Sequence, residues 1–312
     1  MVVRRIRNTV AIITVLFVFL IGLGLSDNNV RDLFFGRALL FNADIGVFIL
    51  DVGQGDSILI KAFNRNILID AGPDKNLSAN KLGSFGVKGL NLVIATHPHS
   101  DHIGGMVEVI KRYNPEYYID PGIPHTSKIY RTLLDLIEEK KIRYIAPNGQ
   151  TIHIHSAELY IFPIPDKVTS INNGSVVSRL SYKDFTMLFL GDAELEEQSF
   201  LIKTNREKLK SRVVKISHHG SNTGTDQRLI DVVKPESAVI SVGKDNPYGH
   251  PHREVMELLK KNNIRIYRTD RDGTVAVLSD GDQYKVLRER GSLGERFAFI
   301  ILQLKELVSG GL

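Results

Sequence analysis

The chain has 312 residues, of which 43% are hydrophobic and 24% are charged, and this composition excludes an intrinsically disordered protein. The length allows one large domain or two small ones, with a sizeable core. A net charge of +5 at pH 7 favours anionic partners only weakly, and the lack of cysteine excludes disulfides and thiolate metal ligands.

Residues 1–26 differ from everything that follows. Three arginines between positions 4 and 7 precede an uncharged apolar run at 10–25. Because positive charge stays on the cytoplasmic side of a membrane, we expect a signal anchor with the rest of the chain outside. Gly22-Leu23-Gly24 is an alternative cleavage site for a signal peptide, which would leave the chain secreted. We interpret residues 27–43 as a linker.

The next segment contains three short β-rich runs, at 44–50, 57–61 and 66–69, which is typical of a half-buried antiparallel sheet. Aspartates stand at or just beyond the ends of these runs, namely Asp51, Asp56 and Asp70. A carboxylate in such a place can orient an imidazole that binds a metal, or it can accept backbone amides in a turn.

The densest group of chemically active residues follows the buried strand expected at 91–95. The phrase Thr96-His97-Pro98-His99-Ser100-Asp101-His102 places three imidazoles and a carboxylate within six residues. In an irregular loop His97 and His99 can share one cation, while Asp101 and His102 can face a second. Imidazole and carboxylate suit Zn²⁺, Mn²⁺ or Fe²⁺. A histidine-rich surface loop without ligands is the alternative, but this spacing is far denser than isolated histidines.

The following elements alternate between helix and strand. We expect helices at 76–85, 106–111 and 127–140, and strands at 117–119, 143–146 and 151–155. His153 and His155 form a second His-x-His pattern on the last strand. No carboxylate or third histidine is near them in sequence, so we interpret both as solvent-facing strand residues.

Asp192 stands at the end of an apolar strand. Strands at 176–182 and 185–190 follow the phrase Asn172-Asn173-Gly174-Ser175 and lead to this residue. A buried aspartate without a cation would cost free energy or become protonated, so Asp192 is the natural carboxylate to bridge two cations. The alternative is a plain N-cap for a helix at 193–201.

Two later loops are also rich in histidine. A strand at 213–216 leads into Ser217-His218-His219-Gly220-Ser221-Asn222-Thr223, where Ser221 and Thr223 offer neutral donors to a phosphate oxygen or act as turn residues. A strand at 238–241 leads into Asn246-Pro247-Tyr248-Gly249-His250-Pro251-His252. His250 is held between glycine and proline in a stiff loop, which suits a contact with a substrate phosphate.

The remaining elements complete a second sheet. We expect helices at 227–233 and 253–261, and strands at 264–269, 274–278 and 284–288 that finish this sheet. The C-terminal segment 291–312 contains an amphipathic helix at 296–308. This helix can dock on the domain, lie on a membrane interface or mediate association, and docking is the default.

Taken together, these phrases resemble the metallo-β-lactamase superfamily and, more narrowly, the extracytoplasmic hydrolase domain of ComEC-type DNA-uptake proteins. The loop from His97 to His102 resembles the superfamily signature. The ComEC-like phrases are Leu50-Asp51-Val52-Gly53-Gln54-Gly55-Asp56-Ser57, Ile69-Asp70-Ala71-Gly72, Asn172-Asn173-Gly174-Ser175, Leu190-Gly191-Asp192-Ala193, Ser217-His218-His219-Gly220-Ser221 and Tyr248-Gly249-His250-Pro251-His252. The likeness covers residues 44–288. It implies an α/β fold, a four-layer αββα sandwich at 44–290 that holds one or two metals.

The resemblance also implies roles for single residues. Asp70 would orient the metal loop by hydrogen bonds, and either His218 or His219 would complete the second metal while its neighbour faces substrate. Most of the superfamily has a histidine where Asn172-Asn173 falls, so the count and identity of the metals, Zn or Mn, stay open. The implied ligands are His97, His99, Asp101, His102, Asp192, His218 and His219. We assign Asp101, His219 and His250 to catalysis, and Asn173, Ser221, Thr223 and His250 to substrate binding.

A metal held by these residues would lower the pKa of a bound water toward neutrality. The leading hypothesis is a phosphodiesterase or nuclease that acts on DNA outside the membrane. Phosphocholine-type or other small phosphoesters are alternative substrates, and β-lactams are less expected. A non-catalytic subunit that binds DNA or an envelope complex is the alternative from another class. The chain lacks the multi-span channel of ComEC proteins, so we expect a membrane channel partner.

Overall fold

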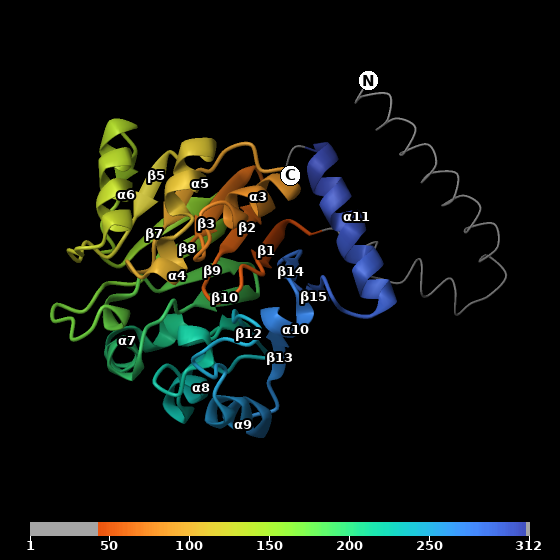
Figure 1. Ribbon diagram of the computed structural model, residues 1–312. Helices are drawn as coiled ribbons and strands as arrows, with labels where there is room; N and C mark the ends of the chain where they lie inside the picture. The colour runs from red at the N-terminus through yellow and green to blue at the C-terminus, as the bar shows by residue number, and fades with distance from the viewer. Residues whose placement is uncertain (1–42, 310–312) are drawn as a thin grey trace, which may run out of the picture.

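A computed structural model describes residues 43–309, and two mixed β-sheets form its centre (Figure 1). The first sheet has the order β15-β14-β1-β2-β3-β4-β5-β6, antiparallel from β15 to β3 and parallel from β3 to β6. Its strands are β1 (Ile45–Ile49), β2 (Ile58–Ala62), β3 (Arg65–Ile69), β4 (Leu92–Ile94), β5 (Tyr117–Ile119), β6 (Arg143–Tyr144), β14 (Val275–Ser279) and β15 (Tyr284–Arg288).

The second sheet has the order β13-β12-β11-β10-β9-β8-β7, antiparallel from β7 to β10 and parallel from β10 to β13. Its strands are β7 (Gln150–Ile154), β8 (Ala157–Ile161), β9 (Ser178–Tyr182), β10 (Phe185–Phe189), β11 (Val213–Lys215), β12 (Ser237–Ile240) and β13 (Arg265–Arg268). We had not predicted β8.

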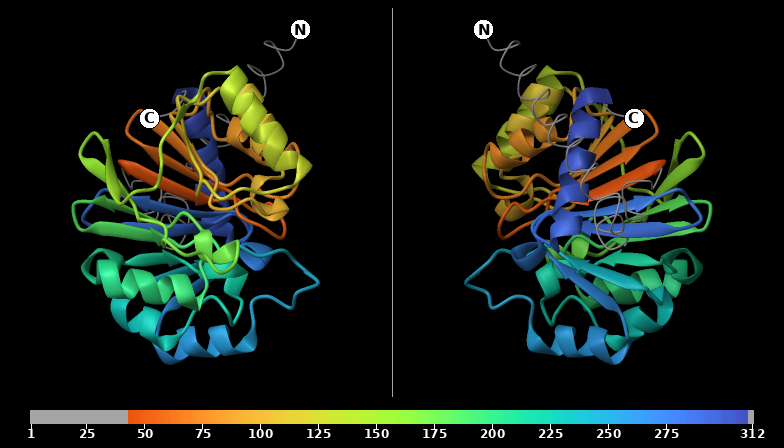
Figure 2. Two further views of the ribbon diagram at one scale, coloured as in Figure 1. Left: turned by 90° about the vertical axis from the view of Figure 1, so that its left-hand side faces the viewer. Right: turned by 90° about the vertical axis from the view of Figure 1, so that its right-hand side faces the viewer.

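Helices cover the outer face of each sheet, so the fold has four layers (Figures 1 and 2). The helices over the first sheet are α3 (Leu77–Ser84), α4 (Ser100–Ile103), α5 (Met106–Tyr113), α6 (Lys128–Glu139) and α11 (Leu293–Ser309). Those beside the second sheet are α7 (Leu195–Leu209), α8 (Gln227–Val233), α9 (Arg253–Lys261) and the short α10 (Thr269–Asp272). Two 3₁₀ turns complete the set, η1 (Asn172–Gly174) and η2 (Ser217–Gly220).

Alternating side chains explain the layers. In β1, Val47 and Ile49 enter the core between the sheets, whereas Phe48 points to the core under α3, α5 and α6. In β10, Met187 faces the core between the sheets and Leu188 faces the core under α7, α8 and α9. Successive strand residues point to opposite faces, so strands buried on both sides are apolar throughout.

Two expectations need correction. We expected 274–278 and 284–288 to finish the second sheet, but β14 pairs with β1 and β15 with β14 in the first. His155 is not on the face of β7. It follows the strand with a φ of 52°, and its Nε2 lies 2.8 Å from Oδ1 of Asn64.

The C-terminal helix α11 docks on the first sheet. Phe299 is buried and its ring centroid lies 6.2 Å from that of Phe85. A buried ion pair joins Lys61 of β2 to Glu306 beneath the helix. Within residues 43–309 no helix combines the length and apolarity needed to cross a bilayer. The anchor expected at 1–26 lies outside the described residues, as does nearly all of the linker at 27–43.

Candidate metal centre

The predicted ligands come together at one edge of the sandwich. β1, β3 and β4 run in the same direction, so the loops after them emerge on one side, and the parallel strands β10, β11 and β12 present their own loops there. The carboxyl ends of parallel strands are the usual place for a site in an open α/β sheet. Residues 97–102 follow β4, Asp192 follows β10, and His218 and His219 follow β11.

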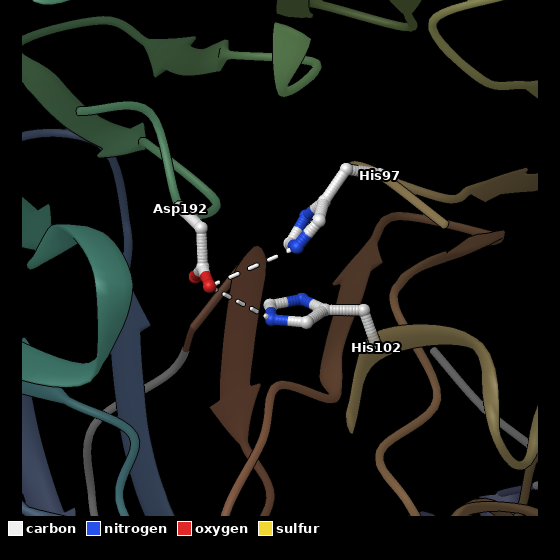
Figure 3. A group of neighbouring side chains, drawn as sticks. All are labelled: His97, His102 and Asp192. Carbon is white, nitrogen blue, oxygen red and sulfur yellow. Dashed lines mark ion pairs between the residues drawn. The ribbon is translucent and has the colours of Figure 1, made fainter. Parts of the chain in front are cut away.

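His97 and His99 share one side of this centre with Asp192. Nε2 of His97 lies 2.9 Å from Nδ1 of His99 and 3.8 Å from Oδ2 of Asp192. Figure 3 shows the Asp192 carboxylate facing the rings of His97 and His102. Burial holds the pKa of His97 well below its ordinary value, which keeps the ring neutral and able to donate a lone pair.

The other side of the centre contains Asp101, His102 and His219. Nε2 of His102 lies 3.3 Å from Oδ2 of Asp192 and 3.8 Å from Oδ2 of Asp101. Nε2 of His219 lies 3.3 Å from Oδ2 of Asp101 and 3.6 Å from Oδ2 of Asp192. Asp192 therefore stands between the two groups of histidines, in the position of a bridging carboxylate.

These residues fit a divalent cation. Nε2 of His102, Nε2 of His219 and Oδ1 of Asp192 are buried and have no hydrogen-bond partner among residues 43–309. Burial alone would raise the pKa of Asp192, but His102 and His219 hold it well below its ordinary value, so the group is a buried anion. Unpaired nitrogen and oxygen donors around a buried anion are the set that zinc, manganese or iron prefers.

The imidazoles of His102 and His219 each have a carboxylate near Nδ1, the ring nitrogen that faces away from Asp192. Oδ2 of Asp70 lies 2.7 Å from Nδ1 of His102, and Asp70 also accepts hydrogen bonds from Thr96 at 2.7 and 2.8 Å. On the other side, Oδ1 of Asp56 lies 3.4 Å from Nδ1 of His219, which also lies 2.9 Å from the carbonyl of Ser241. Such contacts fix the ring and leave Nε2 to face the metal.

Lys215 stabilises Asp56, and we had not predicted this role. Its Nζ lies 2.5 Å from Oδ2 of Asp56, and both side chains are buried. Burial alone would raise the pKa of Asp56, but Lys215 and His219 lower it to about 2. The signal in the sequence is a single charged residue inside the otherwise apolar strand Val213-Val214-Lys215-Ile216.

The structure separates the roles of the paired histidines. His219 is buried between Asp101 and Asp192, whereas the side chain of His218 is 23% exposed. Nε2 of His218 lies 3.8 Å from Oδ2 of Asp192, and its Nδ1 lies 3.2 Å from Oγ1 of Thr223 and 3.4 Å from Oε1 of Glu194. His219 therefore belongs to the candidate groups of metal ligands, and His218 lies at their more exposed edge.

Four other predicted residues have polar contacts that the sequence did not indicate. Asp51 pairs with Arg290 at 2.6 Å and contacts none of the histidines in the described part of the chain. Asn173 faces α7, where its Oδ1 accepts a hydrogen bond from the amide of Glu197. The hydroxyls of Ser221 and Thr223 hydrogen-bond each other, and Thr223 also donates to Glu194. The pair with Arg290 takes the place of the orienting role expected for Asp51, whereas substrate binding by Asn173, Ser221 and Thr223 stays a prediction.

The ligands open into a cavity of about 310 Å³. Beside His99, Asp101, Asp192, His218 and His219, its walls include Gln54, Tyr248 and His250. Nε2 of Gln54 and Nδ1 of His250 are buried and without a partner among residues 43–309. Burial and the neighbouring histidines His218 and His219 lower the pKa of His250 to about 4, so its ring is neutral at pH 7.

Gln54 reaches this cavity because glycines surround it. A Cβ at Gly55 would lie 2.1 Å from the carbonyl oxygen of Asp101, so only glycine lets the loop after β1 pack against the metal loop. The carboxamide oxygen of Gln54 accepts the amide of Gly243 at 3.1 Å, which turns its Nε2 toward the cavity. The available signal in the sequence was a glutamine between two glycines.

Comparison with known proteins agrees with this geometry. The model of the metallo-β-lactamase superfamily matches residues 50–244. The chain is 29% identical over 251 residues to ComE operon protein 3 of Bacillus subtilis, covering 73% of this chain and 32% of that protein. It is 28% identical over 242 residues to competence protein ComA of Neisseria gonorrhoeae, covering 74% and 32%. The chain thus spans about a third of the length of these relatives.

A solved structure shows the same fold. The metallo-β-lactamase fold protein YhfI from Bacillus subtilis superposes with a TM-score of 0.50 at 13% sequence identity, covering 72% of this chain and 96% of that one. At this identity the likeness describes the arrangement of sheets and helices alone.

Proposed function

This chain belongs to the metallo-β-lactamase superfamily, and from that premise we propose that it is a metal-dependent phosphodiesterase that cleaves DNA. The relation to competence protein ComA of Neisseria gonorrhoeae supports DNA as the substrate. The observation that carries the proposal is the convergence of His97, His99, His102, His219 and two aspartates on one centre, which opens into the cavity through His99, His219 and the aspartates.

One set of side chains would hold the cation, and another would bind the phosphodiester. A divalent cation bound here supplies Lewis-acid chemistry, which acidifies water and offsets charge on the phosphoryl group. Asp192 and Asp101 would hold the cation together with His219, whose Nδ1 lies 3.4 Å from Asp56 and whose Nε2 lies 3.3 Å from Asp101 and 3.6 Å from Asp192.

The cavity walls also contain hydrogen-bond donors outside the candidate metal ligands. The unpartnered Nε2 of Gln54 is placed to donate a hydrogen bond to a non-bridging phosphate oxygen. Neutral His250 and the partly exposed His218 contact the same group. Donors aimed at the oxygen atoms where charge develops lower the barrier more than they improve ground-state binding.

A nuclease assay tests the proposal. The purified full chain loaded with Mn²⁺ or Zn²⁺ should cleave DNA, and Asp101→Ala should not. Asp135→Ala is the matched control, because Asp135 is an exposed aspartate of α6 outside the cavity. Equal activity of wild type and Asp101→Ala, or no cleavage by either, would reject the assignment.

We further propose that residues 1–26 tether the catalytic domain to the outer face of a membrane, beside a channel that transports the DNA. Three arginines before the apolar run at 10–25 support this orientation. Protease added to intact cells should then digest the domain, while a cytoplasmic marker survives. A domain that resists protease until the cells are lysed would contradict the orientation, and recovery in the medium would indicate secretion.

A further inference from the structure

The loop between β12 and α9 forms one wall of the metal cavity. It is the light-blue loop that projects from the body of the molecule in Figure 2. Asn246 holds it in shape from inside. Its Nδ2 donates to the carbonyls of Gly243 and His250 at 3.0 and 2.7 Å, and its Oδ1 accepts the amides of Tyr248 and His250 at 3.2 and 3.0 Å. The loop therefore presents Tyr248 and His250 in fixed positions.

Tyr248 places an exposed aromatic ring at the mouth of this cavity. The residue is 62% exposed, and its ring stacks on that of His250 with centroids 5.6 Å apart and planes inclined by 25°. His252 braces the same residue, since its Nε2 lies 3.2 Å from the Tyr248 carbonyl. One face of Tyr248 is thus covered by His250, and the side chain stands next to the site where a phosphodiester would bind.

A second cavity of about 490 Å³ continues from the same loop. His250 belongs to the walls of both cavities, and the exposed side chains of Lys244 and Arg271 line the second one. Arg268 and Asp270 in this cavity pair with each other at 2.6 Å, and Asp245 is its other acidic residue. The candidate metal centre and the ring of Tyr248 thus lie on one side of His250, and the cationic side chains of Lys244 and Arg271 line the neighbouring cavity.

We propose that the centre acts on single-stranded nucleic acid, and that Tyr248 stacks on the unpaired nucleobase beside the scissile phosphate. This inference rests on the phosphodiesterase activity proposed above and names its substrate class. An aromatic ring can stack only on a base whose face is free, which a base inside a duplex does not offer. Lys244 and Arg271 would contact the backbone phosphates that follow.

The test compares oligonucleotides with and without bases. The full chain loaded with Mn²⁺ is given single-stranded DNA, the same strand annealed into a duplex, or a strand of abasic nucleotides of equal length. Tyr248→Ala should lower kcat/KM on the normal strand about 5- to 100-fold, the range that loss of one stacked base produces. Tyr248→Phe should restore cleavage, because it keeps the ring. Tyr144→Ala removes an exposed tyrosine that lines neither cavity and is the matched control.

On the abasic strand, Tyr248→Ala and wild type should be equally active. The inference would be overturned if Tyr248→Ala lost the same share of kcat/KM on normal and abasic strands, or lost none on either. Faster cleavage of the duplex than of the single strand by wild type would also overturn it.

Fluorescence anisotropy of labelled strands in EDTA measures binding without cleavage. If the wild type cleaves no DNA, the phosphodiesterase proposal fails. A base-dependent loss of binding in Tyr248→Ala would still support stacking, and equal binding of both strands would reject it.

Discussion

The ammonium group of Lys215 lies 2.5 Å from Oδ2 of Asp56, in a buried ion pair beside the candidate metal ligand His219. Removing one partner of such a pair leaves a buried charge without compensation. Lys215→Met should therefore lower the free energy of unfolding by about 3–5 kcal/mol. Urea denaturation of the metal-free protein measures this change.

The double variant Asp56→Asn, Lys215→Met separates the lost charge from lost packing. It should recover much of the stability, because neither charge then remains buried. Lys210→Met is the control, since Lys210 is exposed at the end of α7. A double variant that is no more stable than Lys215→Met alone would show that the ion pair is not the cause.

The two neighbouring histidines should differ in metal binding. His219→Ala should lose about one equivalent of metal, because His219 lies within 3.6 Å of both Asp101 and Asp192. His218→Ala should keep its metal and lower kcat about 100-fold, the usual effect of removing a donor to developing charge. Elemental analysis after gel filtration, paired with the nuclease assay, gives both values. Equal metal loss in the two variants would contradict the assignment.

The metal loop could be predicted from the sequence because its ligands are close along the chain. His97, His99 and His102 reach one centre through local geometry alone, and the strand ends that carry Asp192 and His219 are also visible as apolar runs. The separation of His218 from His219 could not be predicted. It depends on backbone φ angles of 48° and 54° and on contacts with Glu194 and Ser241 from other loops.

Long-range pairing limited the rest of the prediction. All five residues of β14 are buried, so its sequence does not reveal which sheet it joins, and it pairs with β1 more than 200 residues earlier. Lys215 and Gln54 are single residues whose roles depend on partners from distant loops. Periodicity identifies the face of a strand but not its neighbour.

Asp70 and Asp51 provide a matched pair for the orientation of the ligands. Asp70→Asn should weaken metal affinity about 10- to 100-fold, because the carboxylate no longer fixes the ring of His102. Asp51→Asn should leave metal affinity unchanged, since Asp51 pairs with Arg290 instead. Titration with metal in competition with a coloured chelator measures both affinities. A loss of the same size in both variants would reject the orienting role of Asp70.

The buried carboxyl of Glu197 should make stability depend on pH. Burial raises the pKa of Glu197 well above its ordinary value, although the amide of Ser175 donates a hydrogen bond to it at 3.2 Å. The folded protein therefore keeps this proton at pH values where the unfolded chain, with a pKa of about 4.3, has lost it. The stability that this group contributes is complete below the pKa of the unfolded chain. It falls as the pH rises toward the raised pKa of the folded state.

The variant Glu197→Gln cannot ionise, so its free energy of unfolding should decline less than that of wild type between pH 5 and pH 8. Urea denaturation of metal-free protein at both values tests this, with the exposed neighbour variant Glu196→Gln as the control. Parallel declines in wild type and Glu197→Gln would show that this carboxyl does not titrate with unfolding.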